Sequence, residues 1–155
     1  MASRIEDALA KLGLVLPEAP APRANYVPAV RTGSLVFIAG QLPLKDGQLP
    51  YLGRLGESVS IDSGQQAARL CALNILAVLR NACDGDLDRV RRCVRLGGFV
   101  ASTVDFLEQP QVVNGASDLI VAAMGEAGKH ARTAVGVAQL PRGVPVEVDA
   151  IFEVD

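Results

Sequence analysis

The last quarter of the chain, residues 130–155, places the tightest constraint on the fold. It reads HARTAVGVAQLPRGVPVEVDAIFEVD, in which two runs of β-branched and small residues flank a break at residues 140–143. Proline and glycine at this spacing are typical of a turn, so the stretch predicts a β-hairpin with a longer loop. Period-two alternation puts Glu147, Asp149 and Glu153 on one face of the second strand and apolar side chains on the other. We therefore expect a strand with one buried face and one acidic face.

Two longer segments have helical periodicity. Asp62 or Ser63 can cap a helix that runs to about Cys83, and Pro110 stands near the first turn of a second helix. An S-x-x-E capping box at the N-terminus predicts a short helix before Gly13. The second helix has an apolar stripe at three-and-four spacing, formed by Val112, Val113, Ala116, Leu119, Ile120 and Ala123.

The strands complete the predicted order. Residues 26–31 and 35–39 form a first hairpin around a Thr-Gly-Ser turn, and residues 90–102 have strand character. The order of helix, two strands, long helix, strand, helix and two strands predicts an α+β fold, a mixed β-sheet with both long helices packed on one face. We expect one domain over residues 1–155, in which residues 1–24 form the short helix and an extended strap containing Pro17, Pro20 and Pro22.

Composition excludes several classes of function. Fifteen basic and seventeen acidic residues give a net charge of −2, which provides no overall attraction to nucleic acid or to an acidic membrane surface. The most apolar run, residues 70–79, is too short to span a bilayer. Three cysteines without a C-x-x-C pair are typical of free thiols in a reducing compartment, so we expect a cytoplasmic protein without membrane attachment.

One basic cluster permits two interpretations. Four arginines lie between residues 89 and 95, where they could bind RNA or could form a solvated strand edge that blunts aberrant pairing. No aromatic residues for base stacking are interleaved with these arginines, and this favours the strand-edge interpretation.

Arg132 and Glu147 are the candidates for chemistry. His130 is the one histidine, so a metal site built on several histidines is excluded within one chain, and we expect no metal. An arginine offers a planar fork to a carboxylate, whereas a glutamate can orient or deprotonate a water molecule. Together the two residues suit a small substrate that carries a carboxylate. The simpler alternative is a structural ion pair between neighbouring strands.

Strand register argues against a direct pair between them. In a hairpin that turns near Pro141, Arg132 faces Ile151 and Glu147 faces Gly136, an offset of about 13 Å along the strand. Arg132 then either pairs locally with Asp149 or Glu153, or meets Glu147 across a subunit boundary. The second arrangement predicts an oligomer.

The sequence resembles the reactive intermediate deaminase family, also called RidA, YjgF/YER057c/UK114 or L-PSP endoribonuclease. The resemblance covers roughly residues 26–154, which we take as the family core, and is most specific in the C-terminal block. It is carried by Tyr26-Val27, Ala39-Gly40-Gln41-Leu42-Pro43, Asn114, residues 131–135, Leu140-Pro141 and residues 146–151.

The resemblance implies a chorismate-mutase-like fold of the bacillus type, assembled as a homotrimer with clefts between subunits. It implies that Arg132 binds the carboxylate of a 2-imino acid and that Glu147 positions the attacking water, with a 2-keto acid and ammonia as products and no cofactor. The implied substrate-binding positions are Tyr26, Gly40, Asn114 and Ala134. The chain differs from many members at Ala39, where they carry a hydroxyl residue, and from some at Ala134, where they carry a cysteine.

Two other functions stay open at this stage. A trimer that binds a small carboxylate without turning it over would need Arg132 but no catalysis. RNA cleavage would depend on the arginine cluster at residues 89–95, and the net charge disfavours it.

Overall fold

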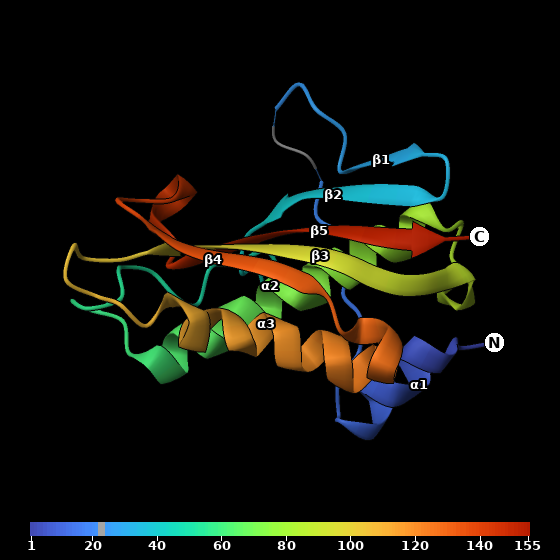
Figure 1. Ribbon diagram of the computed structural model, residues 1–155, viewed down its shortest axis with the longest axis horizontal. Coiled ribbons are helices and arrows are strands. Elements are labelled where there is room, and N and C mark those ends of the chain that lie inside the picture. Colours follow the sequence, from blue (N-terminus) through green and yellow to red (C-terminus); the bar gives the residue numbers. More distant parts are fainter. Residues whose placement is uncertain (22–23) are drawn as a thin grey trace.

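The predicted order of elements is confirmed. The computed structural model describes residues 1–21 and 24–155, so Pro22 of the predicted strap lies outside the described residues. Figure 1 shows the arrangement of the elements. The helices are α1 (Arg4–Lys11), α2 (Ile61–Ala82) and α3 (Gln109–Met124), with short 3-10 turns η1 (Leu87–Arg89), η2 (Gly125–Gly128) and η3 (Pro141–Gly143). The strands are β1 (Ala29–Thr32), β2 (Leu35–Gln41), β3 (Val90–Ala101), β4 (Ala131–Val137) and β5 (Val146–Val154).

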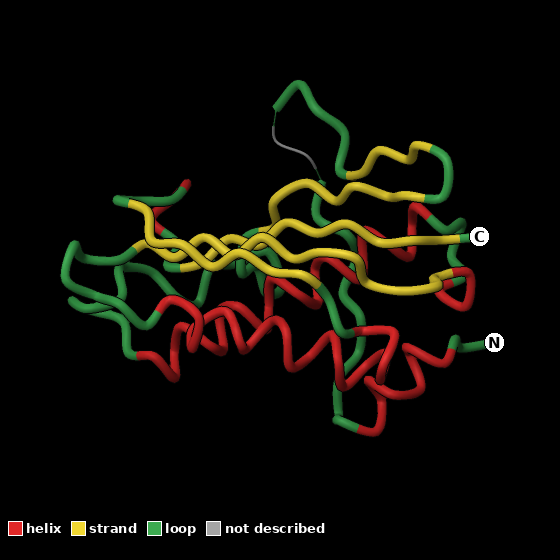
Figure 2. Tube along the Cα trace, in the orientation of Figure 1, coloured by secondary structure: helices red, strands yellow, loops and turns green. Residues whose placement is uncertain are grey.

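The five strands form one mixed sheet in the order β1-β2-β5-β3-β4. Neighbouring strands are antiparallel except β3 and β4, which run parallel and are connected through α3. A parallel pair needs a long crossover, and a helix supplies it. All the helices lie on one side of the sheet (Figures 1 and 2). The fold is therefore α+β, with both long helices on one face as predicted.

The predicted closing hairpin is wrong. β4 and β5 are consecutive in sequence, but β3 lies between them and pairs with both. Residues 140–145 instead cross the end of β3, where the Ala101 amide donates a 2.9 Å hydrogen bond to the Pro145 carbonyl. The Gly53 amide likewise donates to the Gly143 carbonyl over 2.9 Å. The Pro-Arg-Gly turn has the chemistry of a hairpin loop, yet the connection spans a third strand.

β5 has the two faces that its alternation predicts. Every second residue from Val146 to Val154 is buried against the helices, and the residues between them are half-buried on the opposite face. We call this opposite face the open face of the sheet. Phe37 and Val135 also lie on it and are 42% and 40% exposed. No helix of the described part of the chain covers the open face.

Local sequence explains both long helices. The Ser60 side chain caps α2 by accepting a hydrogen bond from the Ser63 amide, so the predicted cap at Asp62 or Ser63 is two or three residues late. In α3 the buried residues are the predicted stripe. The two helices pack so closely that a Cβ at Gly115 would stand 2.1 Å from the Gln65 carbonyl oxygen. A glycine is needed where helix backbones approach in this way.

The arginine cluster lies at a sheet edge only in part. Pairing with β4 starts at Arg95, so residues 90–94 of β3 have β5 alone as neighbour, whereas from Arg95 onward β3 is an interior strand. Most of the arginines have acidic partners: Arg89 pairs with Asp84, Arg91 with Asp155 and Arg95 with Asp149. No helix in the described part of the chain has the length and apolar character needed to cross a membrane.

Candidate functional site

Arg132 lies on the helix side of β4 and is held against α3. One terminal nitrogen, Nη1, donates to Asn114 Oδ1 over 2.7 Å and to Ser117 Oγ over 3.1 Å. The other, Nη2, donates to the Pro110 carbonyl over 3.4 Å. Asn114 and Arg132, both predicted from the sequence, are therefore direct neighbours. The guanidinium is half-buried and lies at the edge of the sheet, since β4 is the last strand in the sheet order.

The guanidinium keeps two N–H groups for a ligand. Arginine has five N–H donors, of which the contacts above use two on Nη1 and one on Nη2. Nε–H and one N–H of Nη2 have no acceptor among the described residues, and a carboxylate needs two such donors for a bidentate contact.

The positive charge of Arg132 has no acidic partner within 4.0 Å in the part of the chain that the structure describes. Its acceptors are an amide, a hydroxyl and a carbonyl, which are all neutral. The alternative of a local pair with Asp149 or Glu153 is not observed, because both acids lie on the open face whereas Arg132 contacts α3, and Asp149 accepts from Arg95 Nη1 over 3.4 Å. The site therefore presents a half-buried, uncompensated cation, which is a receptor for an anion.

Glu147 lies on the open face near the start of β5. Its side chain covers Gly40, where a Cβ would meet Glu147 Oε1 at 2.5 Å. Glycine at position 40 thus leaves room for the carboxylate. Burial, and secondarily the charge of Asp149, raise the pKa of Glu147. A carboxylate with a raised pKa is a stronger proton acceptor, as a general base requires.

Tyr26 lies close to Gly40, the glycine that faces Glu147. Both line a small pocket of about 50 Å³ at the end of β2, together with the strap residues Pro20 and Ala21. Tyr26 is 49% exposed, so its ring is available to a molecule outside the chain. The predicted residues therefore form two groups, Arg132 with Asn114 and Glu147 with Gly40 and Tyr26.

The sheet separates these two groups within one chain. Arg132 on β4 pairs with Leu96 of β3, and Glu147 on β5 pairs with Phe99 of β3. The two residues therefore lie on either side of β3 with an offset of three residues, which separates their Cα atoms by about 14 Å. They also point to opposite faces, because Arg132 contacts α3 whereas Glu147 lies on the open face. The sequence-based register was wrong, since it assumed a hairpin, but the conclusion that the two side chains do not meet in one chain is confirmed.

Ala134 and Ala39 offer only backbone or methyl contacts. Ala134 is two residues beyond Arg132 on the helix side of β4 and packs on the core. The Ala39 carbonyl accepts a 3.1 Å hydrogen bond from Gln41 Nε2, where β2 deviates from regular pairing with β5. Neither position brings a reactive group to the site.

The cysteines are poor candidates for a nucleophile. All three are buried and free. Burial raises the pKa of the Cys93 thiol to about 12, and burial followed by the charge of Glu147 raises that of Cys71 well above its ordinary value. These thiols are therefore protonated and unreactive at neutral pH. Among the described residues, no group of three or more His, Cys, Asp or Glu side chains is placed to hold a metal ion.

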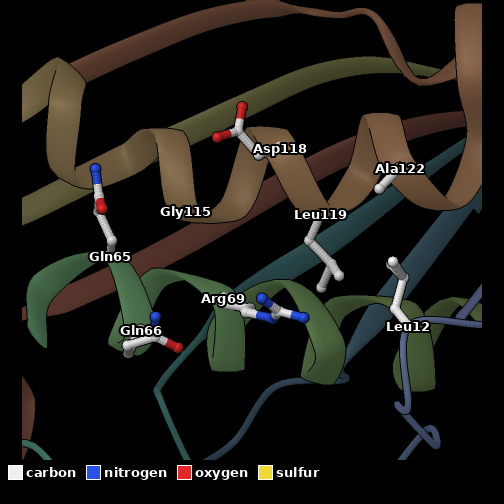
Figure 3. A pocket seen from close by; sticks show the side chains of 8 residues that line it. All are labelled: Leu12, Gln65, Gln66, Arg69, Gly115, Asp118, Leu119 and Ala122. Carbon is white, nitrogen blue, oxygen red and sulfur yellow. The ribbon is translucent and has the colours of Figure 1, made fainter. Parts of the chain in front are cut away.

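A larger groove lies elsewhere, between α2 and α3. It encloses about 290 Å³ and is lined in part by Gln65, Arg69 and Asp118 (Figure 3). It includes none of the site residues predicted from the sequence, and Arg69 and Asp118 form no ion pair with each other. Its lining carries no group of converging reactive side chains.

Ser117 and His130 are the contacts that sequence reasoning missed. Ser117 Oγ lies 2.9 Å from His130 Nε2, and the other ring nitrogen lies 2.6 Å from the Gly128 carbonyl oxygen. Ser117 lies one turn after Asn114 on α3, so the i, i+3 spacing from Asn114 is the signal that could have placed it near Arg132.

The comparisons with known proteins agree with this fold. Residues 6–146 match the family model described as "YjgF/chorismate mutase-like, putative endoribonuclease". Among the curated relatives, "Protein TCP17" of Trypanosoma cruzi is 50% identical over 98% of this chain and 95% of its own length. The "2-iminobutanoate/2-iminopropanoate deaminase" of Salmonella typhimurium is 32% identical over 86% of this chain and 90% of its own.

Two solved structures are similar as well. Atu1372 of Agrobacterium tumefaciens, described as of unknown function, has a TM-score of 0.93 at 49% identity and covers 98% of this chain and 93% of its own. E. coli TdcF, solved with bound serine, has a TM-score of 0.65 at 25% identity, covering 89% of this chain and 94% of its own.

The chain belongs to the YjgF/RidA family and has its chorismate mutase-like fold. That family includes an imine deaminase, whereas the similar structure Atu1372 has no assigned function.

Proposed function

We propose that the protein is a hydrolytic deaminase of small 2-imino acids that works in clefts between the subunits of a homotrimer. The observation that carries this proposal is the uncompensated charge of Arg132, whose neutral partners leave two N–H donors available. These donors suit a carboxylate bound in bidentate fashion. The Salmonella relative named as a deaminase supports the class of substrate, and the serine in TdcF supports a small ligand with an amino-acid-like carboxylate.

The reaction needs only water and a positioned base. Arg132 holds the substrate carboxylate, which fixes the neighbouring imine carbon near Glu147 of the next subunit. Glu147 accepts a proton from water as the water oxygen bonds to the imine carbon, and passes this proton to the nitrogen to give a carbinolamine. It then takes the hydroxyl proton and delivers it to the nitrogen as the carbon–nitrogen bond breaks. Imine and water thus become 2-keto acid and ammonia. Orienting a water molecule at an already electrophilic carbon supplies much of the acceleration, and the raised pKa of Glu147 suits it as the base.

The separation of the two groups supports an oligomer. Arg132 and Glu147 lie on opposite faces of the sheet, so in the proposed trimer a second copy of the chain would bring Glu147, Gly40 and Tyr26 to Arg132. The open face, with exposed Phe37 and Val135, is the surface available for that contact. We further propose a cytoplasmic location, supported by three buried cysteines without disulfides.

An imine-hydrolysis assay tests the function. We expect the wild type to accelerate 2-keto acid formation from 2-iminobutanoate generated in situ, and Arg132→Ala to lose about 100-fold in kcat/KM, because a half-buried contact between charged groups is lost. Arg132→Lys keeps the charge without the fork and should recover only part of that loss. Equal acceleration by wild type and Arg132→Ala, or none by either, contradicts the proposal. Saturable binding of a 2-keto acid without turnover would instead identify a carboxylate-binding protein.

A further inference from the structure

A series of hydrogen bonds connects Arg132 to Gly128, in the turn that precedes β4. Arg132 Nη1 donates to Ser117 Oγ over 3.1 Å, and that oxygen lies 2.9 Å from His130 Nε2. His130 Nδ1 lies 2.6 Å from the Gly128 carbonyl oxygen. Ser117 belongs to α3 and Arg132 to β4, so these hydrogen bonds connect the helix and the strand that position the guanidinium.

The chemistry of the partners fixes the direction of every bond. A carbonyl oxygen only accepts, so Nδ1 of His130 carries a hydrogen and donates to Gly128. In a neutral imidazole Nε2 is then an acceptor, and it takes the hydroxyl hydrogen of Ser117. The remaining lone pairs of Ser117 Oγ accept from Arg132. Each group is satisfied with a neutral ring in the Nδ1–H tautomer. In this tautomer the acceptor nitrogen Nε2 orients the Ser117 hydroxyl toward the ring and leaves the lone pairs of Ser117 Oγ for Arg132.

The hydrogen bonds of Nη1 leave the opposite edge of the guanidinium, formed by Nε and Nη2, for a ligand. Asn114 and Ser117 together use both hydrogens of Nη1, so this nitrogen cannot turn toward a substrate without losing two bonds. We infer that Ser117 and His130 are positioning residues, which lock the Arg132 guanidinium so that its Nε–H and Nη2–H present a preformed fork to the substrate carboxylate. This inference rests on the proposed role of Arg132 in binding that carboxylate. Neither residue has to touch the reacting atoms.

The first test measures the network directly and does not depend on activity. Nitrogen-15 NMR of His130, at a pH well above the ordinary histidine pKa of about 6.5, reports which ring nitrogen carries the proton. We expect the Nδ1–H tautomer, which a solvated histidine disfavours, and a shift toward Nε2–H in Ser117→Ala. The Arg132 Nη signals should be separate in the wild type and merge in Ser117→Ala as rotation is freed. An Nε2–H tautomer in the wild type overturns the inference.

The second test separates positioning from a structural role. Arg132 holds the carboxylate equally in ground and transition states, so loosening it should raise KM and leave kcat nearly unchanged. We expect Ser117→Ala and His130→Phe to raise both KM for 2-iminobutanoate and Kd for 2-oxobutanoate by about tenfold. Ser117→Thr keeps the hydroxyl and should bind like the wild type. Lys129→Ala is the matched control, since Lys129 adjoins His130 but pairs with Glu126.

The outcomes distinguish this inference from the proposed function. An active wild type with an unchanged KM in Ser117→Ala rejects the positioning role alone. A wild type that binds 2-oxobutanoate without turning over the imine rejects the deaminase, while Kd and the tautomer still decide the positioning role. A wild type that neither binds nor reacts rejects the proposed function, and a positioning role toward a carboxylate falls with it.

Discussion

At the scale of single residues, the Arg132 guanidinium depends on partners from a neighbouring helix, Asn114 and Ser117 of α3. Arg132 and Asn114 were predicted as site residues from sequence motifs, and in the structure Arg132 Nη1 lies 2.7 Å from Asn114 Oδ1. The contact of Ser117 with His130 spans thirteen residues and exists only because β4 docks against α3. No local pattern encodes that docking, which is why the support of Arg132 could not be predicted.

The raised pKa of Glu147 predicts a pH-dependent change in stability. Its carboxyl binds a proton more tightly in the folded than in the unfolded chain. The contribution of Glu147 to stability is therefore fully present below the unfolded pKa of about 4.3 and is lost as pH rises through the raised folded value. We expect wild type to lose stability relative to Glu147→Gln over that range, measured by urea unfolding at fixed protein concentration.

The matched control for this experiment is Glu153→Gln, which removes a carboxyl from the same face of β5. Comparing the two variants separates the local environment of Glu147 from the change in net charge. A difference between wild type and Glu147→Gln that is the same at every pH would contradict the raised pKa.

At the scale of elements, sequence periodicity predicted the buried face of a helix correctly but did not predict which strands pair. The α3 stripe was predicted residue for residue, because helix burial follows from spacing along one segment. The closing hairpin was wrong, because strand pairing depends on partners far away in sequence. Nothing in residues 130–155 reveals that β3 inserts between β4 and β5.

The close packing of α2 and α3 predicts a strong effect of one methyl group. In Gly115→Ala the new Cβ would meet the Gln65 carbonyl oxygen at 2.1 Å, and backbone cannot move aside cheaply. Alanine favours a helix over glycine by up to about 1 kcal/mol, but the clash should dominate. We expect a net loss of about 1–3 kcal/mol in the free energy of unfolding, measured by urea denaturation.

Asp118→Ala on the same helix is the control, because Asp118 is exposed and its change should stay within about 0.5 kcal/mol. Gly115 also adjoins Asn114, so a displaced α3 should weaken 2-oxobutanoate binding through Arg132. Unchanged stability in Gly115→Ala would show that the helices are farther apart in solution.

At the scale of the whole molecule, the proposed function needs the two groups of candidate residues together. The sheet holds Arg132 and Glu147 apart on opposite faces, so in that proposal one chain carries two incomplete parts of a site. The prediction that they do not meet within a chain was correct even though its register was not, because either arrangement places them several residues apart on different strands.

Mixing inactive variants tests whether a site is shared between subunits. At substrate concentrations well below KM, Arg132→Ala and Glu147→Gln should each be nearly inactive, but mixed trimers contain sites with an intact Arg132 from one subunit and an intact Glu147 from the next. With random mixing, the chance of an intact Arg132 from one subunit is one half, and so is the chance of an intact Glu147 from the next. About a quarter of the sites are therefore complete, and about a quarter of wild-type activity should return. The measurement is imine hydrolysis after the two variants are unfolded and refolded together.

Wild type mixed with the double variant supplies the reference. It should retain about a quarter of the activity of an all-wild-type trimer if each site spans two subunits, and about a half if each site lies in one. No recovery in the mixture of single variants would place Arg132 and Glu147 in the same chain. Three copies of the 16.2 kDa chain should also elute near 49 kDa.

The position of β5 in the sheet has a consequence for how the chain folds. β5 joins β2 on one side to β3 on the other, and it is the last strand in sequence. Until it is in place, the hairpin of β1 and β2 has no strand link to β3 and β4. A nascent chain on the ribosome must therefore hold two unfinished sheet fragments, with the edges that β5 will cover exposed to other chains, until its final strand emerges.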